Sequence, residues 1–260
     1  MRPKIDTVYG NLTDTIFTAI NNLPGEGTDE YQLPSPADSV TWRSIFENII
    51  SENYNAAACD AEVLDYEIIY FIDTVEGCHI PYYLVRKTNA GTNHWGTYIF
   101  NPNACRPDVV ISAPHPKKDF NTGKQGIHIF ENARAGVFCL SGTNRCNSTD
   151  STICDGSTTV CGGGSAYRIS DAAHDVNHPF QLASEVIADE MPSSVFVQLH
   201  GFSKQPTDPF VIMSTGTVNA PTVDYTLDLS AGLKEADDTL DFKIPHFDAG
   251  WTRLIGTTNT

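Results

Sequence analysis

The chain of 260 residues has no apolar run that approaches the roughly 18–20 residues of a membrane-spanning helix. We therefore expect no membrane partner. Positive charge is also scarce, because 16 Lys and Arg stand against 32 Asp and Glu, for a formal net charge of −16. A field of this sign repels polyanions, so we expect no nucleic-acid partner. The acidic residues are scattered, which is typical of a solubility role; attraction of cationic substrates is the alternative.

Several catalytic and nucleotide-binding motifs are missing. There is no P-loop and no Gly-x-Gly-x-x-Gly after a predicted strand, so the sequence does not support nucleotide binding. A serine esterase remains a competing hypothesis, because Leu199-His200-Gly201-Phe202 is similar to a lipase oxyanion loop. Its Gly-x-Ser-x-Gly elbow is not matched: residues 212–216 begin with isoleucine, and residues 162–166 lack the last glycine.

Cysteine is present in seven copies but never as a Cys-x-x-Cys pair, which argues against a zinc ribbon. Cys139 lies inside an apolar run and is predicted to be a buried thiol. The other six flank polar loops, and this pattern favours disulfides without fixing their pairing. The first residues do not read as a signal peptide. Because disulfides form in oxidising compartments, the loop cysteines favour a secreted or periplasmic protein whose signal has been removed.

The hydrophobic pattern predicts an α/β fold with a mixed, mostly parallel sheet and helices on both faces. Helices are predicted over 12–22 and 38–54, the second capped by Asp38 or Ser39. Antiparallel strands on the N-terminal side follow, the first two forming a hairpin, over 62–73, 79–87 and 95–100.

From residue 108 the pattern alternates between strands and helices, which is typical of a parallel sheet. Strands are predicted over 108–114, 136–141, 194–199, 209–215, 241–246 and 252–257. Helices are predicted over 122–133, 178–190 and 222–236, with a capping box from Thr122 and Gln125 and with Pro179 in the first turn of the second. No linker separates two regions, so we expect one domain over 1–260.

The segment 142–170 interrupts this alternation. It is rich in Ser, Thr and Gly and contains Cys146, Cys154 and Cys161. We expect at least one disulfide among the three, since the segment has few apolar residues to hold its shape. Because it leaves the end of a strand, we expect it to lie over the site described next; a decorative insertion is the alternative.

Two histidines follow predicted strands directly. His115 stands between two prolines after the strand 108–114, with Asp119 four residues later, and His200 follows the strand 194–199. Ligands of open α/β sheets bind at the carboxyl ends of strands. Two histidines and a carboxylate there predict a Zn²⁺ site formed by His115, Asp119 and His200. Glu131, the alternative carboxylate, lies about three turns into a helix.

Further polar residues are expected beside this site. Asn144 and Arg145 follow the strand 136–141 and are predicted to bind a substrate carboxylate or an oxyanion, with a surface ion pair as the alternative for Arg145. His174 is a candidate proton shuttle, oriented by Asp171 or Asp175. The alternative is that this segment is solvated and that Asn177 only caps the next helix.

The run Pro114-His115-Pro116-Lys117-Lys118-Asp119-Phe120-Asn121-Thr122-Gly123, followed by a helix, a strand and a Leu-His-Gly strand end, carries a family resemblance. It resembles zinc amidohydrolases of the N-formylglutamate amidohydrolase and poly-γ-glutamate hydrolase type, which share the zinc-carboxypeptidase (phosphorylase/hydrolase-like) architecture. The resemblance covers about residues 108–200 and implies metal ligation by His115, Asp119 and His200. Aspartate replaces the family's glutamate, the spacing differs, and the glutamate base of the carboxypeptidases has no counterpart.

These observations predict a zinc-dependent hydrolase of amide or peptide bonds. Its substrate would be a small molecule or a peptide, and one with a free carboxylate if Arg145 recognises it. The alternative from another class is a binding protein that keeps the fold without the chemistry, which the missing glutamate favours.

Overall fold

A computed structural model describes residues 5–77, 79–257 and 259 of the chain. The chain divides into two compact units, a larger one that ends at Gly201 and a smaller one from Phe202 to Asn259. Each unit is described by itself, and the expected single domain stays a prediction. Within the described ranges, no helix has the length and apolar content needed to cross a membrane.

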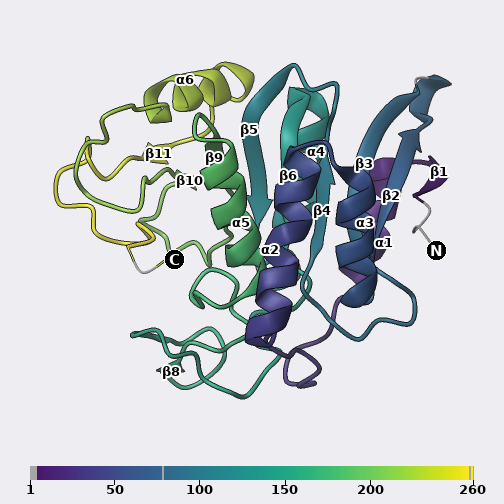
Figure 1. The fold of residues 1–260 in the computed structure, drawn as a ribbon. Helices are drawn as coiled ribbons and strands as arrows, with labels where there is room; N and C mark the ends of the chain where they lie inside the picture. Colours follow the sequence, from purple (N-terminus) through teal and green to yellow (C-terminus); the bar gives the residue numbers. More distant parts are fainter. Residues whose placement is uncertain (1–4, 78, 258, 260) are drawn as a thin grey trace. The chain divides into compact units, whose positions relative to one another are not determined.

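The larger unit is an α/β unit with a seven-stranded mixed sheet in the order β1-β2-β3-β4-β6-β5-β9 (Figure 1). Its strands are β1 Asp6–Gly10, β2 Tyr66–Asp73, β3 Ile80–Lys87, β4 Thr97–Phe100, β5 Arg106–Ala113, β6 Ala135–Leu140 and β9 Val195–Gln198. Its α-helices are α1 Leu12–Asn21, α2 Pro36–Ile50, α3 Tyr54–Val63, α4 Thr122–Ala133 and α5 Pro179–Glu190. The predicted fold class is confirmed.

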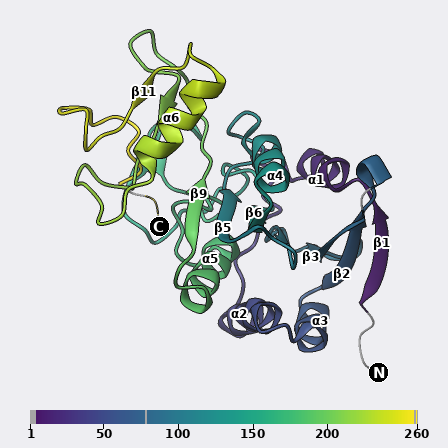
Figure 2. The same ribbon diagram turned by 90° about the horizontal axis from the view of Figure 1, so that it is seen from above.

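Helices cover both faces of the sheet (Figure 2). On one face, α1 and α4 bury Leu12, Ile16 and Phe130 against the strands. On the other face, α2, α3 and α5 form a second core that includes Trp42 and Phe180. Removal of these side chains from water stabilises both layers, by about 1.5–3 kcal/mol for each large apolar side chain.

Strand direction decides where the polar loops emerge. β5 pairs in parallel with both β6 and β9, while β2, β3, β4 and β6 form successive antiparallel pairs. In the register, Ala113 lies opposite Leu140, and Ser112 lies opposite Gln198. The carboxyl ends of β5, β6 and β9 therefore meet at one edge of the sheet.

Several local predictions are wrong. The helix predicted over 38–54 is two helices, and α3 occupies residues where the strand 62–73 was expected to begin. Ser35 caps α2, in a capping box with Asp38. At α4 the N-cap is Asn121, whose backbone is left-handed and whose side chain makes no cap bond, so the expected box of Thr122 and Gln125 does not form.

The smaller unit contains β10 Val211–Ile212, α6 Thr226–Ala236 and β11 Phe242–Lys243, with β10 and β11 paired in parallel. The strands expected over 209–215 and 241–246 are thus reduced to two residues each, and no strand forms within the described part of 252–257. No residue of α6 is buried. This unit contains none of the metal-ligand candidates described below.

Candidate metal centre

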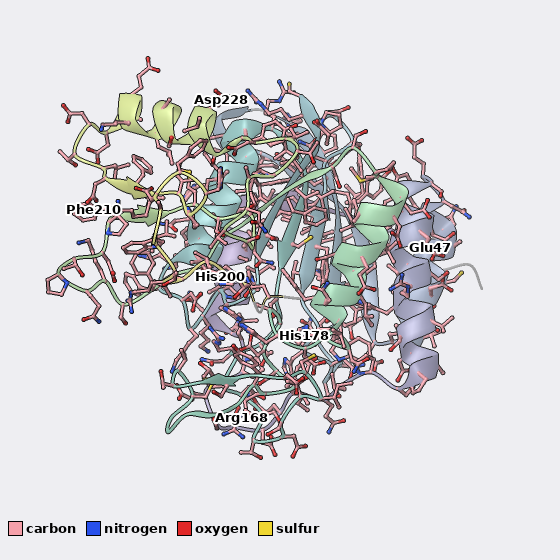
Figure 3. All side chains as sticks on the ribbon, turned by 90° about the vertical axis from the view of Figure 1, so that its left-hand side faces the viewer. Glu47, Arg168, His178, His200, Phe210 and Asp228 are labelled. Atoms are coloured by element: carbon pink, nitrogen blue, oxygen red, sulfur yellow. A yellow bond between two sulfur atoms is a disulfide. The ribbon has the colours of Figure 1, made fainter. Side chains whose placement is uncertain are left out.

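Three strand ends supply the residues of the site. His115 follows β5 by two residues, Asn144 and Arg145 follow β6, and His200 follows β9 by two residues. His178 and His200 lie between the sheet and the part of segment 142–170 that carries Arg168 (Figure 3). The sequence prediction that these strand ends converge is confirmed.

The close approach of β6 to residues 94–96 depends on glycine at the strand exit. A Cβ on Gly142 would lie 2.4 Å from the backbone nitrogen of Gly96 and 2.6 Å from the carbonyl oxygen of His94. Both distances are shorter than real Cβ contacts. Glycine at this position therefore allows the chain to turn toward Asn144 and Arg145 without displacing its neighbour.

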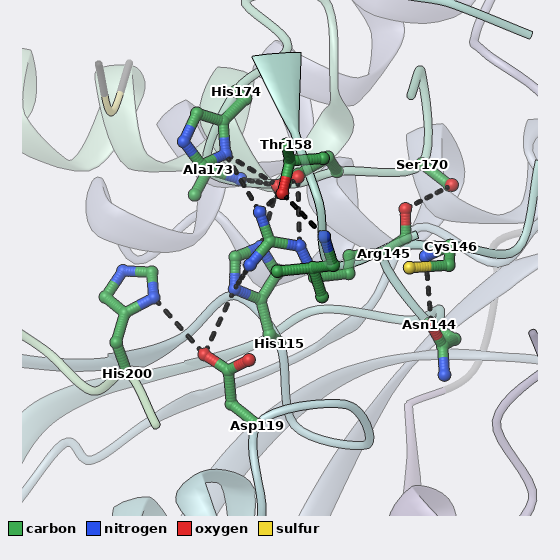
Figure 4. A network of polar contacts seen from close by, with 12 residues as sticks. His115, Asp119, Asn144, Arg145, Cys146, Thr158, Ser170, Ala173, His174 and His200 are labelled. Carbon is green, nitrogen blue, oxygen red and sulfur yellow. Dashed lines mark hydrogen bonds and ion pairs between the residues drawn. The ribbon is translucent and has the colours of Figure 1, made fainter. Parts of the chain in front are cut away.

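Asp119 lies between His115 and His200 (Figure 4). Its Oδ2 atom is 3.3 Å from His115 Nδ1 and 3.4 Å from His200 Nδ1. The three residues could hold a metal ion, since one ligand atom of each lies within 4.8 Å of the others. Tetrahedral zinc with bonds of about 2.0–2.1 Å would place neighbouring ligand atoms about 3.3–3.4 Å apart. The two distances to Asp119 fit that geometry.

Both histidines have a partner on the ring nitrogen that faces away from Asp119. His115 Nε2 lies 2.7 Å from Asp171 Oδ1, and His200 Nε2 lies 2.7 Å from Gln198 Oε1. Neither oxygen can donate a hydrogen bond, so each Nε2 carries the proton and donates it. A proton on Nδ1 would be donated to Asp119 Oδ2, and a bound metal would take the place of that proton on the Nδ1 lone pair. Outer partners of this kind orient histidine ligands in metal sites.

A second group of residues shares His115. His115, Asp171 and His174 also have ligand atoms within 4.8 Å of one another, and this buried group could hold a metal ion as well. Its carboxylate is already paired, however, because Arg145 donates from Nε at 3.0 Å and from Nη2 at 2.6 Å to Asp171 Oδ2. A divalent cation bound through Asp171 would have to compete with these two hydrogen bonds, whereas the carboxylate of Asp119 faces two imidazole nitrogens. Asp119 is therefore the more available of the two carboxylates.

Asp171 is the centre of the hydrogen-bond network. The side chain is fully buried and accepts from His115, Arg145, the ring of His174 at 2.9 Å and the backbone N–H of Ala173 at 3.3 Å. Burial opposes ionisation of this carboxyl and is the largest single effect. The donors from His115 and His174 and the charge of Arg145 still hold its pKa well below the usual range.

The pKa shifts of the first group agree with a cation-binding arrangement. For Asp119, burial raises the pKa, but hydrogen bonds from His115, His200 and the backbone of Gly201 outweigh it and keep the carboxyl ionised. For His200, burial is the largest effect and lowers the pKa, so the neutral ligand form is favoured. For His115, burial also lowers the pKa, but Asp171 and Asp119 outweigh this effect, so the pKa is raised above its usual value. A bound metal would therefore have to replace a proton.

The expected auxiliary residues lie close to this centre. His174 is buried, stacks on Tyr167 at 3.9 Å and is oriented by Asp171; the other candidate partner, Asp175, accepts from the backbone of Asn177 instead. The alternative role for Asn177 is wrong, since His178 is the N-cap of α5.

Arg145 is almost fully buried and paired with Asp171, so the alternative of a surface ion pair does not apply. Its remaining nitrogen, Nη1, lies 3.4 Å from His115 Nδ1. Asn144 Oδ1 accepts a hydrogen bond from the backbone N–H of Cys146 at 2.9 Å, and this bond shapes the turn. Substrate binding by Arg145 and Asn144 stays a prediction.

The side chains that the sequence offers as alternatives have other contacts: Glu131 as the metal carboxylate, and Ser165 or Ser214 as a nucleophile. Glu131 accepts a hydrogen bond from Thr13 at 2.5 Å. Ser214 donates to the carbonyl of Ile255, and Ser165 donates to that of Gly162. In the described part of the chain neither serine is hydrogen-bonded to a histidine. Neither of these two serines therefore has, among the described residues, the hydrogen-bonded histidine that activates a serine nucleophile, and the serine esterase stays an alternative prediction.

Two functional positions were missed by sequence reasoning. Asp171 was considered only for His174, although it also holds His115, and Gln198 was not considered at all. Gln198 alternates with Val197 at the end of β9 and precedes His200 by two residues, so both side chains point to the same side of the strand. That spacing could have identified it. The contact between Asp171 and His115 spans 56 residues and has no local signal.

The segment 142–170 is held by a disulfide between Cys146 and Cys161, with a sequence separation of 15. The prediction of a disulfide among the three cysteines is confirmed, and so is the buried thiol of Cys139. Cys59 and Cys105 are exposed thiols, Cys154 is a half-buried thiol, and Cys78 lies outside the described residues. The short strands β7 Ser157–Thr158 and β8 Ser165–Ala166 pair within the segment.

No family model, no curated protein and no solved structure matches the chain. The resemblance to zinc amidohydrolases therefore stays a prediction.

Proposed function

We propose that the chain is a zinc-dependent hydrolase of amide or peptide bonds, with His115, Asp119 and His200 as the metal ligands. The observation that supports this most directly is the position of Asp119 Oδ2, which is 3.3 Å and 3.4 Å from two imidazole nitrogens whose rings are each oriented by another partner. Two nitrogens and one carboxylate oxygen form a donor set that zinc enzymes use.

An accessible side of the site supports catalysis over a purely structural metal. The side chain of His200 is 32% exposed, whereas His115 is fully buried and Asp119 nearly so. When bound, zinc would supply an activated water and polarise a substrate carbonyl. A structural zinc site is usually closed by four protein ligands, whereas three ligands leave a position for water or substrate.

His174 is the residue we assign to proton transfer. Its Nδ1 is fixed by Asp171, so its Nε2 would accept and return a proton, as in other carboxylate–histidine pairs. The ring centres of His174 and His115 are 6.4 Å apart, so transfer would pass through a water.

One observation favours the alternative of a non-catalytic metal-binding protein. The carboxylates that the structure places among these histidines, Asp119 and Asp171, are both held ionised by several donors and would be weak bases. Within the described residues, no glutamate belongs to either metal-ligand group. If His174 does not act as the base, the site would bind a metal without turnover.

The disulfide supports a further part of the proposal. Stable disulfides form in oxidising compartments, so we infer a secreted or periplasmic location.

Metal content and turnover test the proposed function together. We expect one zinc per chain by elemental analysis and hydrolysis of at least one member of a panel of N-acyl amino acids and short peptides. His115→Ala and His200→Ala should each weaken zinc binding more than about a hundredfold, beyond the 10–100-fold typical of outer partners. His128→Ala, which replaces an exposed histidine on α4, is the matched control and should bind zinc normally.

The outcomes separate the two candidate functions. Stoichiometric zinc with no turnover by any assay would support the binding protein. Zinc retained at full affinity in both ligand variants would contradict the site itself. Far-ultraviolet circular dichroism should be nearly unchanged in all three variants, because His115 and His200 lie outside the helices and strands and alanine at exposed His128 favours a helix.

A further inference from the structure

A continuous set of contacts connects the disulfide to a metal ligand. Cys146 is next to Arg145, and the carbonyl oxygen of Arg145 lies 3.9 Å from Cys161 Sγ and accepts a hydrogen bond from Ser170 Oγ at 3.0 Å. The guanidinium of the same arginine holds Asp171 with two hydrogen bonds. Asp171 in turn holds His115 Nε2 at 2.7 Å.

The disulfide joins two parts of segment 142–170 that differ in burial. Residues 141–148 are buried, whereas Gly162, Gly163 and Gly164 are exposed, have positive φ and meet no atom within 4 Å of a Cβ position. The covalent bond therefore ties an exposed glycine run to the buried turn that carries Arg145. Without this bond, hydrogen bonds alone would have to offset the conformational entropy that the loop loses when it becomes ordered.

The orientation of Asp171 matters for metal binding because of its charge and its two oxygens. Oδ1 accepts from His115, while Oδ2 accepts from Arg145. If Arg145 moves away, Asp171 is left buried with less positive charge beside it, and the hydrogen bond that fixes the tautomer of His115 weakens. An outer partner of this kind is typically worth 10–100-fold in metal affinity.

We propose that the Cys146–Cys161 disulfide controls metal affinity at His115, Asp119 and His200 through Arg145 and Asp171, and that its reduction releases the metal. This inference rests on the proposed zinc site. A dithiol reductant would transfer two electrons and two protons to the bond. The S–S bond breaks, two protein thiols form, and the dithiol becomes a disulfide. The metal site would then be loaded in an oxidising compartment and weakened in a reducing one.

Serine variants test the inference better than reduction alone, because newly formed thiols bind zinc themselves. All proteins carry Cys154→Ser, which removes a half-buried thiol from the same segment. Zinc affinity is measured by competition with a chromophoric chelator, at a temperature where circular dichroism shows each protein folded. The variants are Cys146→Ser/Cys161→Ser, Arg145→Met, and the combination of all three changes.

We expect the double serine variant and Arg145→Met each to bind zinc 10–100-fold more weakly than the parent. We expect the combined variant to be no weaker than Arg145→Met, because both changes act on one path. Unchanged affinity in the serine variant would overturn the inference. So would losses that multiply in the combined variant, because the disulfide would then act by another route.

A second measurement keeps the inference testable if the proposed zinc site fails. The tautomer of His115 can be read from ¹⁵N chemical shifts of the metal-free protein at an alkaline pH where the ring is neutral. We expect the Nε2–H form in the parent and a mixture of tautomers in both the serine and Arg145→Met variants. Absence of zinc binding with this tautomer change would contradict the proposed function alone. An unchanged tautomer in both variants would contradict the coupling.

Discussion

His178 should make the protein sensitive to acid through a mechanism that one substitution can isolate. The imidazole is fully buried, and its Nδ1 accepts a hydrogen bond from the backbone N–H of Phe180 at 3.0 Å as the N-cap of α5. A protonated ring could not accept this bond. It would also place a positive charge at the positive end of the helix dipole.

The expected magnitude follows from the pKa. Burial is the main cause that lowers the pKa of His178 from 6.5 to about 3, assisted by His115 and opposed in part by Asp171. The folded state then binds fewer protons than the unfolded state between these two values, so stability falls as the pH falls. The contribution of His178 is fully present above pH 6.5. It declines by about 1.4 kcal/mol per pH unit, on the order of 5 kcal/mol at pH 3.

The assay is urea denaturation of metal-free protein at pH 7, 6, 5 and 4, for the parent and for His178→Asn. Asparagine caps helices well but does not titrate, so the variant should lose less stability on acidification. It also loses the ring stacked on Tyr31, 4.9 Å away, which should cost about 0.5–1.5 kcal/mol at every pH. The quantity that tests the reasoning is therefore the difference between the two proteins and its dependence on pH.

Below pH 6.5 this difference should change in favour of the variant by about 1.4 kcal/mol per pH unit. His128→Asn, at an exposed histidine on α4, is the control for the substitution itself. Parallel curves for the parent and His178→Asn would refute the reasoning, because His178 would then titrate alike in the folded and unfolded states.

Three further predictions concern the disulfide, Arg145 and a helix cap. Cys146→Ser/Cys161→Ser should lower the free energy of unfolding by about 3 kcal/mol, the chain-entropy value for a loop of about 15 residues, in reversible denaturant titrations; a loss near zero would show that hydrogen bonds alone hold the segment. Arg145→Lys keeps the charge but not both hydrogen bonds from Nε and Nη2 to Asp171 Oδ2, so we expect kcat/KM to fall at least about tenfold for substrates with a free and with an amidated carboxylate. A larger loss for the free carboxylate would show, in addition, the predicted substrate recognition by Arg145. Ser35→Ala should cost about 1 kcal/mol, because it removes the capping box of α2, whereas Ser39→Ala, at a predicted cap position that lies inside the helix, should cost less in the same thermal or urea titration.

The strongest periodic patterns gave accurate helices and strands. The helix over 122–133 agrees residue for residue, because Ile127 and Phe130 fall on one face. Weak patterns failed where a second element begins soon after the first. The Ala-rich stretch Tyr54–Val63 shows little amphipathic contrast. The predicted helix 38–54 and strand 62–73 include only its two ends, and no element is predicted over 55–61.

Helix caps were predicted less well than helix interiors. A cap depends on backbone angles at one residue, and several Ser, Thr and Asp residues near each start could serve. At α4 the left-handed backbone of Asn121 displaces the expected geometry, and Thr122 Oγ1 donates instead to the carbonyl oxygen of Asp119 at 3.0 Å. The same bond helps to hold the loop that carries the candidate ligand.

By itself, the sequence determined the α/β class, the residues at the carboxyl ends of β5, β6 and β9, and the group of His115, Asp119 and His200, since each depends on local spacing and strand order. Only the tertiary structure decided which nitrogen of each histidine faces Asp119, and that Arg145 is paired with Asp171. These features depend on contacts between residues 26 and 56 positions apart, and on the partner that each ring nitrogen finds after folding. For His115 and Arg145 no local pattern encodes such a partner, because a buried donor bonds to whichever acceptor oxygen the packed layers bring within reach.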